Sequence, residues 1–201
     1  ELPPLCSGGL TVDHTYAEDF EDPQSAPWAS RVEVGSNHWI YPSPAELEFA
    51  TSGVSALYAA GSDARGASWM EMTADVVVPA GARLRFRHSY GFDTDAGDNL
   101  DVGVLRYSID GGATWSDAGA LISGGAGYNG TASAVTDNPL AGSQGFVGDS
   151  FGYTATELDL SSLAGQNTPQ SITSRFADGS TTGFLTFVPT HGAGLYCFQS
   201  I

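Results

Sequence analysis

Four aspartates lie within nine residues, between two segments of strand-like pattern: Asp93, Asp95, Asp98 and Asp101. Ca²⁺ is a hard cation that takes six to eight oxygen ligands, and closely spaced carboxylates with loop carbonyls supply them. Gly97 lets the chain fold back within this acidic loop, because glycine tolerates a positive φ. The residue types and their spacing therefore suggest a structural calcium site.

The acidic loop is not an EF-hand, because the twelfth residue counted from Asp93 is Val104, where that motif requires a bidentate Glu. A second acidic group, at residues 19–22, joins the loop only if the fold brings the two together. The alternative is a set of solvated carboxylates on a strongly acidic chain. The candidate metal ligands are Asp19, Glu21, Asp93, Asp95, Asp98 and Asp101.

A short aromatic segment contains His38, Trp39 and Tyr41 and is closed by Pro42 and Pro44. Aromatic rings with exposed faces can stack on sugars, while neighbouring polar groups fix the orientation of the ligand. These three residues are therefore candidates for glycan stacking. The alternative is that they pack in the core or within a loop.

The segment Gly148–Gly152 matches the G-x-S-x-G nucleophile elbow by letter, with Ser150 at its centre. That motif requires a strand before the serine and a helix after it, whereas residues 153–156 continue as strand or turn. We predict a structural turn here. The four histidines share no metal-ligand spacing, and His88 lies on an apolar strand face, where we expect a buried core residue. No catalytic residue is predicted.

The composition limits the classes of partner. The chain has 201 residues, 41% of them hydrophobic, and its net charge is −16, with seven arginines, no lysine and 23 acidic residues. Binding to nucleic acid depends on neutralising phosphates, so this charge argues against it. No apolar run approaches the roughly 20 residues that a membrane-spanning helix needs. We expect no nucleic-acid partner and no insertion into a membrane.

Two cysteines, Cys6 and Cys197, stand near opposite ends of the sequence. We predict that a disulfide joins them, and two separate thiols are the alternative. Neither has the spacing of a zinc ligand. A disulfide would place the chain outside the reducing cytosol.

The hydrophobic pattern has the period of β-strands. From Leu84 to Tyr90 every second residue is aliphatic or aromatic, with arginines or serine between them, as in a strand with one buried face. Residues 102–109 form a second strand, and 110–112 a tight turn. Other strands are predicted at 15–21, 28–34, 37–41, 46–50, 55–59, 68–78, 145–152, 153–160, 171–176, 183–188 and 193–198, with a long loop at 116–142 and one helical turn at 161–165.

No helical period continues over ten residues, and about a dozen short strands separated by turns indicate an all-β protein built as a β-sandwich of two antiparallel sheets. We predict long loops and little or no helix. The expected organisation is an extended N-terminal segment at residues 1–14 and one sandwich domain at residues 15–201.

Several segments together resemble a known domain. The most specific is Tyr-Ser-Ile-Asp-Gly-Gly-Ala-Thr-Trp at Tyr107–Trp115, and others stand at 19–21, 78–81, 101–105 and 138–142. Across roughly residues 18–178 the chain is similar to MAM-like jelly-roll domains of secreted bacterial proteins, including metallopeptidases of the immune inhibitor A type. Such domains tend to finish with a Gly-Trp strand and paired aspartates, which residues 183–187 lack. The resemblance implies a jelly roll with an adhesive or accessory role.

We therefore expect a non-catalytic, extracellular or cell-surface binding or adhesion module, stabilised by calcium, that forms an accessory domain of a larger secreted protein. Its partner would be an extracellular protein, a carbohydrate or a second copy of the chain. One alternative is a structural subunit of an appendage, filament or surface layer that assembles through edge strands or termini, with residues 1–14 as the donated segment. Another is a hydrolase, which would need a concave site with convergent titratable groups.

Overall fold

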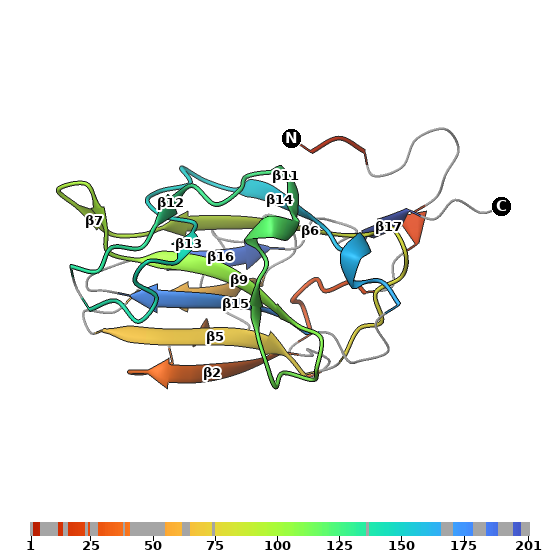
Figure 1. Ribbon diagram of the computed structural model, residues 1–201, viewed down its shortest axis with the longest axis horizontal. Helices are drawn as coiled ribbons and strands as arrows, with labels where there is room; N and C mark the ends of the chain where they lie inside the picture. The colour runs from red at the N-terminus through yellow and green to blue at the C-terminus, as the bar shows by residue number, and fades with distance from the viewer. Residues whose placement is uncertain are drawn as a thin grey trace.

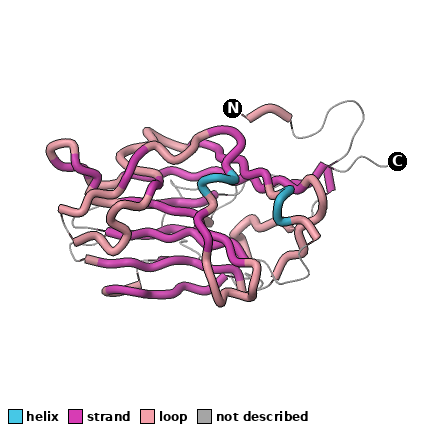
Figure 2. Tube along the Cα trace, viewed as in Figure 1, coloured by secondary structure: helices cyan, strands magenta, loops and turns pink. Residues whose placement is uncertain are grey.

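A computed structural model describes the chain over residues 2–4, 12–13, 16–22, 24, 28–37, 39–40, 55–61, 65–73, 75–135, 137–165, 171–178, 184–188 and 195–197. The strands at 12–13 and from residue 171 onward are described by their backbone. Figure 1 and Figure 2 show strands running across the molecule in stacked layers, joined by loops and two short turns of 3₁₀-helix.

The described strands form two main sheets. Sheet A has the order β11-β14-β6-β16-β4-β3, with β17 alongside the start of β6 and β1 paired to β17. Its members are β1 Val12–Asp13, β3 Trp39–Ile40, β4 Leu57–Ala60, β6 Ala82–Gly91, β11 Ile122–Gly125, β14 Thr154–Asp159, β16 Phe184–Val188 and β17 Leu195–Cys197. Sheet B has the order β10-β9-β15-β5-β2. Its members are β2 Trp28–Val34, β5 Gly66–Met72, β9 Val102–Ser108, β10 Ser116–Asp117 and β15 Ser171–Asp178.

The order in which the chain visits the sheets is that of a jelly roll. The strands β4, β5, β6 and β9 alternate between sheets A and B, β10 remains in sheet B, and β14, β15 and β16 alternate again. The result is β4-β16-β6-β14 in one layer and β5-β15-β9-β10 in the other, with antiparallel pairing throughout. Two interlocked Greek keys have this order. The predicted all-β jelly-roll sandwich is confirmed.

Smaller elements complete the described chain. The hairpin of β7 (Thr94–Asp95) and β8 (Asp98–Asn99) follows β6, and β12 (Gly130–Thr131) pairs with β13 (Gln144–Gly145). The short 3₁₀-helices are η2 (Gly119–Leu121) and η3 (Ser161–Leu163), the second within the predicted helical turn. No described helix is long and apolar enough to cross a membrane.

The main core lies between the sheets, where alternate residues of each strand meet. Its buried members come from β3, β4, β5, β6, β9 and β14, and from loops next to these strands. Phe20 also packs into this core, although it lies outside any strand. Buried members include Phe20, Trp39, Leu57, Met70, Tyr90, Phe92, Leu105, Phe146, Leu158 and Leu160.

His88 occupies the centre of this core with no exposed surface. The Thr156 hydroxyl donates to the Ala126 carbonyl at 2.7 Å, so it accepts from His88 Nε2, which lies 2.9 Å away. Burial lowers the pKa of His88 from 6.5 to about 3, so the imidazole is neutral in the folded protein. The surrounding aromatic rings are those of Phe86, Tyr90 and Phe146, with centroids at 5.1, 5.5 and 4.6 Å.

The opposite face of β6 carries arginines that pair with β14. Arg85 Nη2 and Arg83 Nη1 lie 2.5 and 3.2 Å from the two Glu157 carboxylate oxygens, and Arg83 Nη2 lies 3.0 Å from Asp159. The Arg85 and Glu157 side chains are only 12% and 11% exposed, so the pair is well removed from water. Two of the seven arginines therefore serve to hold sheet A together.

A second, smaller core lies on the outer face of sheet B. Val102, Val104 and Ala67 from the sheet pack there against Leu140 and other residues of the segment 129–147. The backbone of this segment approaches β9 closely, since a Cβ at Gly145 would stand 2.3 Å from Val102 Cγ2. One part of the outer face of sheet B is thus covered by this segment.

Several predicted elements differ from the structure. The strand predicted at 145–152 ends at Gly145, and the loop predicted at 116–142 contains β10, η2, β11 and β12. Residues 16–21 form no strand, because the Glu18 and Asp19 side chains accept hydrogen bonds from the backbone N–H groups of Phe20 and Glu21 and bend the chain. Phe20 there adopts a φ of 59°. The strand predicted at 68–78 ends at Met72. The strand predicted at 46–50 lies outside the described residues.

Candidate functional site

Five polar or aromatic residues lie on the outer face of sheet B, beside the second core. They are Arg31 of β2, Trp69 and Glu71 of β5, Arg106 of β9 and Asp117 of β10, and we call them the sheet B face. Register pairs Arg31 with Trp69 and Asp117 with Arg106, and paired residues of adjacent strands point to the same side. Alternate residues of one strand also share a side.

Trp69 is held in place by its neighbours. Its indole Nε1 donates to Glu71 Oε2 at 3.0 Å, while Arg31 Nη2 lies 2.8 Å from the other carboxylate oxygen. The Arg31 side chain is 50% exposed and that of Glu71 19%, and Trp69 is partly exposed. A fixed, partly exposed indole beside a carboxylate and a guanidinium is therefore present on the outer face of sheet B.

Asp117 and Arg106 stand opposite each other across β10 and β9, yet the carboxylate is bound elsewhere. Asp117 Oδ1 accepts from the Gly119 N–H at 2.7 Å, and Oδ2 lies 3.5 Å from the Tyr128 hydroxyl. That hydroxyl is fixed by Leu105, whose N–H donates to it at 2.7 Å and whose carbonyl accepts from it at 3.2 Å. Desolvation by burial raises the pKa of Tyr128, so it stays protonated. Among the described residues, no hydrogen bond or ion pair engages the Arg106 guanidinium.

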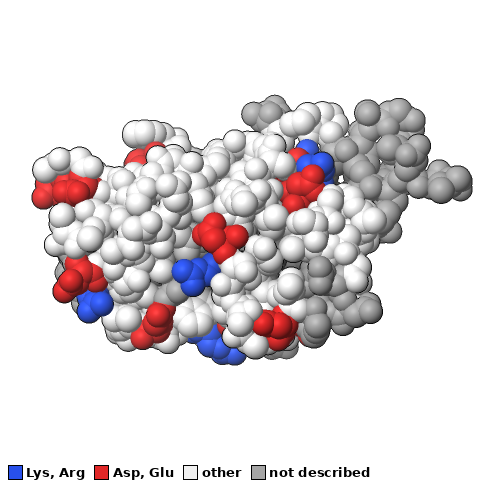
Figure 3. All heavy atoms as spheres, in the orientation of Figure 1, with Lys and Arg blue, Asp and Glu red and all other residues white. Residues whose placement is uncertain are grey.

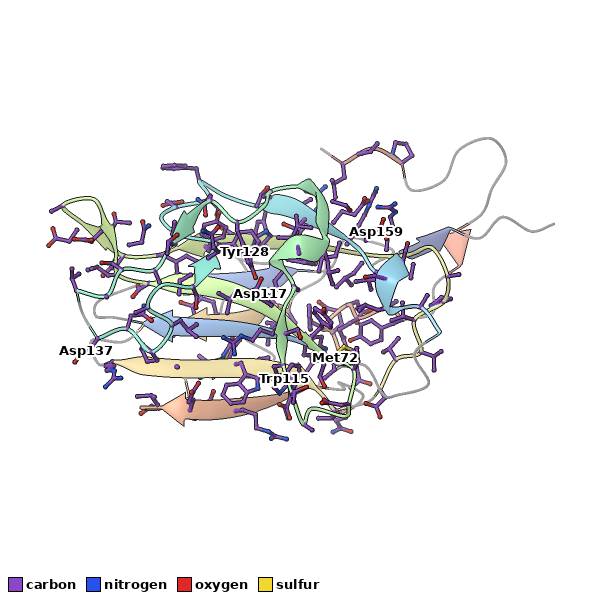
Figure 4. The ribbon with its side chains drawn as sticks, viewed as in Figure 1. Met72, Trp115, Asp117, Tyr128, Asp137 and Asp159 are labelled. Carbon is purple, nitrogen blue, oxygen red and sulfur yellow. The ribbon has the colours of Figure 1, made fainter. Side chains whose placement is uncertain are left out.

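The surroundings of the sheet B face are visible in the figures. Trp115 and Asp117 lie along the segment that leaves β9 and passes in front of the sheet, and Tyr128 lies between β11 and β12 (Figure 4). The space-filling view shows that most of this side of the molecule is uncharged, with isolated acidic and basic groups, although the whole chain carries a charge of −16 (Figure 3). The face is thus less acidic than the composition suggests.

Of the three predicted glycan-stacking residues, only Trp39 is among the described residues. Trp39 is only 6% exposed and belongs to the main core, so this ring follows the alternative of core packing. His38 and Tyr41 lie outside the described residues. The sequence shows that this segment contains aromatic rings, but the pairing of β3 with β4 decides which of them points into the core.

The acidic loop forms the β7–β8 hairpin, where Gly97 has a φ of 96° and turns the chain as expected. Its aspartates have different surroundings. Asp95 is exposed, Asp98 accepts a hydrogen bond from the Ser133 hydroxyl at 2.8 Å, and Asp101 is fully buried with Oδ2 3.1 Å from the Asp93 N–H.

The second acidic group stabilises the segment before β2. Asp19 Oδ1 accepts from the Glu21 N–H at 3.1 Å, and Glu21 Oε1 accepts from the Ser55 N–H at 2.9 Å. Over the described ranges, no three His, Cys, Asp or Glu side chains lie close enough together to hold a metal ion. Calcium binding stays a prediction.

Ser150 has a structural environment. Its hydroxyl donates to the Tyr90 carbonyl at 3.0 Å and accepts from the Tyr90 N–H at 2.8 Å, so it ties the 148–152 turn to β6. Phe151 follows with a φ of 53° and is 92% exposed. The predicted structural turn is confirmed.

The predicted Cys6–Cys197 disulfide is not tested, because Cys6 lies outside the described residues. The backbone of Cys197 pairs with that of Val12, so the strand that carries it lies beside the N-terminal segment. The candidate donor segment, residues 1–14, therefore contributes β1 to a sheet of its own chain.

The sheet B face was not predicted, although one signal for it was present. Met70 and Met72 alternate with Trp69 and Glu71, so burial of the methionines implies that the tryptophan and the glutamate face the other way. What the sequence does not reveal is which strands lie beside β5 and bring the two arginines to the same surface.

No protein-family model matches the chain, and no curated protein matches its sequence. Solved structures do show similarity. The carbohydrate-binding module TmCBM61, in complex with β-1,4-galactotriose, is 11% identical, with 87% of this chain and 89% of that chain covered and a TM-score of 0.45. A structure described for the promiscuous specificity of carbohydrate-binding modules from the β-sandwich superfamily is 12% identical, covers 96% and 64%, and has a TM-score of 0.49.

The K1 cleaved adhesin domain of Lys-gingipain from Porphyromonas gingivalis is 12% identical, with 96% of this chain and 100% of that chain covered and a TM-score of 0.48. These neighbours are carbohydrate-binding and adhesin β-sandwich domains. Because the identities and TM-scores are this low, the jelly-roll assignment rests on the strand order and pairing of the chain itself.

Proposed function

We propose that this protein is a non-catalytic carbohydrate-binding module that binds its ligand on the sheet B face. The observation that carries the proposal is the arrangement of Trp69, Glu71 and Arg31, in which a partly exposed indole is fixed by a carboxylate that also binds a guanidinium. Because the indole is oriented before the ligand arrives, little side-chain entropy is lost on binding.

The chemistry of the three side chains suits a sugar. The apolar face of a pyranose ring packs on an aromatic face, and its hydroxyls need donors and acceptors at the edge of the ring. Glu71 offers acceptors, and Arg31 offers several N–H donors in a planar fork. The open surface of a sheet can also accommodate an extended chain of sugars.

The proposal includes a location outside the cell and a role as an accessory or adhesion module, because soluble polysaccharides and cell-surface glycans are the expected ligands. Ser150, the one serine in an apparent nucleophile motif, is bound to the Tyr90 backbone and lies on the turn before β14, on sheet A. The proposed role therefore assigns no reacting group to this chain.

The proposal is tested by measuring binding to a panel of soluble polysaccharides and oligosaccharides, with galactan, xylan, mannan, polygalacturonate and alginate included. Affinity electrophoresis identifies a ligand, and titration calorimetry gives its Kd. We expect Trp69→Ala to weaken binding by about 30-fold or more, because a central aromatic anchor is typically worth at least 2 kcal/mol.

The matched control is Phe151→Ala, which removes another exposed aromatic ring at a turn attached to sheet A. This variant should bind as the wild type does. Circular dichroism and melting temperature confirm that each variant is folded. Absence of binding to every glycan in the panel, or an equal affinity of the Trp69→Ala variant, would refute the sheet B face as a carbohydrate site.

A further inference from the structure

Arg106 presents a guanidinium on the sheet B face for which the folded chain supplies no partner within its described part. The nearest candidate by register is Asp117, but its carboxylate is bound by the Gly119 N–H at 2.7 Å and lies within 3.5 Å of the Tyr128 hydroxyl. Glu71, two strands away in the same row, is bound by Trp69 and Arg31. The two carboxylates of this face are therefore occupied elsewhere.

We propose that Arg106 is an anion subsite for an acidic sugar, and that the ligand of the sheet B face is an oligosaccharide carrying a carboxylate or a sulfate. This inference rests on the proposed function, because it assigns the chemical class of the glycan that Trp69 binds. A guanidinium suits the task, since its planar donors match a carboxylate or sulfate in a bidentate manner.

The geometry fits a ligand of several sugar units. Arg106 pairs with Thr173 of β15, which in turn pairs with Glu71 of β5, so Arg106 and Glu71 stand two strand spacings apart. With about 4.8 Å between strands and about 3.4 Å per residue along a strand, the α-carbons of Arg106 and Trp69 are about 12 Å apart. A pyranose on the indole and an acidic group on Arg106 would belong to different sugars of one chain.

Charge limits the kind of acidic glycan. A net charge of −16 repels a dense polyanion, although at physiological ionic strength the repulsion is screened beyond about 8 Å. Among the described residues, the acidic groups on the side shown in Figure 3 are separated by uncharged surface, so a short or sparsely substituted acidic oligosaccharide can approach it. We therefore expect a ligand with separated acidic groups.

The test uses pairs of probes that differ only in the acidic group. Xylo-oligosaccharides with and without one glucuronic acid branch, trigalacturonic acid with its methyl ester, and a galactotriose with and without one sulfate are compared by titration calorimetry. We expect at least one acidic member to bind about tenfold more tightly than its neutral partner, because hydrogen bonds to charged groups contribute about that much. The pair that shows the preference distinguishes a carboxylate from a sulfate.

The variants separate the two proposals. Arg106→Gln should remove the preference for the acidic probe and leave the affinity for the neutral partner within about twofold. The control is Arg87→Gln, which makes the same change of charge on β6 of sheet A and should keep the preference.

Equal binding of acidic and neutral probes by the wild type, or an unchanged preference in Arg106→Gln, overturns the anion subsite while the carbohydrate-binding function stands. Binding that is unaffected by Trp69→Ala overturns the function, and the subsite with it.

Discussion

Acid should destabilise this protein through His88. The imidazole is fully buried, and its pKa of about 3 in the folded state compares with 6.5 for an unperturbed histidine. Because the folded pKa is lowered, the unfolded chain binds the extra proton first as pH falls. Stability is therefore lost from about pH 6.5 downward, and the loss from this group ends near pH 3.

The size of the effect follows from the two pKa values of His88. Each unit corresponds to 1.36 kcal/mol, so between pH 7 and pH 4 the free energy of unfolding should fall by about 3 kcal/mol from this residue alone. The matching variant is His88→Gln, which cannot titrate and retains a donor for the Thr156 hydroxyl. It should be less stable than the wild type at pH 7 by about 1–3 kcal/mol, because the core packing changes.

The assay is urea unfolding followed by tryptophan fluorescence at pH 7, 6, 5 and 4. The wild type should lose about 3 kcal/mol more than His88→Gln over this range, and contributions from carboxylates cancel in the comparison because both proteins share them. An NMR titration of the imidazole carbon-bound protons should show no protonation of His88 in the folded protein above pH 4. Equal pH dependence of the two proteins would contradict a buried, neutral His88.

Three further predictions concern the Asp110 carboxylate, calcium binding by the acidic loop and the Cys6–Cys197 disulfide. Hydrogen bonds from the side chain and backbone of Thr114, and then from the Ser108 hydroxyl, lower the pKa of Asp110 to about 2. The contribution of this carboxylate to folding stability is therefore lost as pH falls from about 4 towards 2. The Asp110→Asn variant should show a weaker dependence of its stability on pH in that range. The melting temperature should be higher in millimolar Ca²⁺ than in EDTA if the acidic loop binds calcium, and replacing Asp95 and Asp98 by Asn should abolish the difference; no shift would leave the loop without a cation. The intact mass without reductant should be two hydrogens lower than after reduction, and an unchanged mass would refute the disulfide.

The strands could be predicted because their signal is local. The strand β2 runs from Trp28 to Val34 as its pattern indicates, and the alternation from Leu84 to Tyr90 places His88 on the buried face of β6. A period of two depends only on which side of the sheet meets the core, so neighbouring residues suffice to reveal it. The turn at Gly97 follows in the same way from the conformational freedom of glycine.

The binding partners of the acidic side chains could not be predicted, because carboxylates accept hydrogen bonds from backbone N–H groups as readily as they bind cations. Asp19 accepts a hydrogen bond from a residue two positions on, and Glu21 from one 34 positions on. Asp101 is buried next to the Asp93 N–H. Proximity in the sequence therefore shows which carboxylates share a loop but gives no measure of how many oxygens remain for a metal ion.

On the sheet B face, a backbone N–H group again competes with a cationic group for a carboxylate, here that of Asp117. Register places Asp117 opposite Arg106, and an ion pair would be expected from the pairing of β10 with β9 alone. The turn that follows β10 exposes the Gly119 N–H, which takes the carboxylate first at 2.7 Å. A hydrogen bond within two residues costs little chain entropy, so it prevails over a cross-strand ion pair near the protein surface, which typically contributes less than about 1 kcal/mol. Because the turn binds the Asp117 carboxylate, the Arg106 guanidinium is available for a ligand. The shape of this turn, and not the number of arginines, therefore supports an anion subsite on an acidic protein.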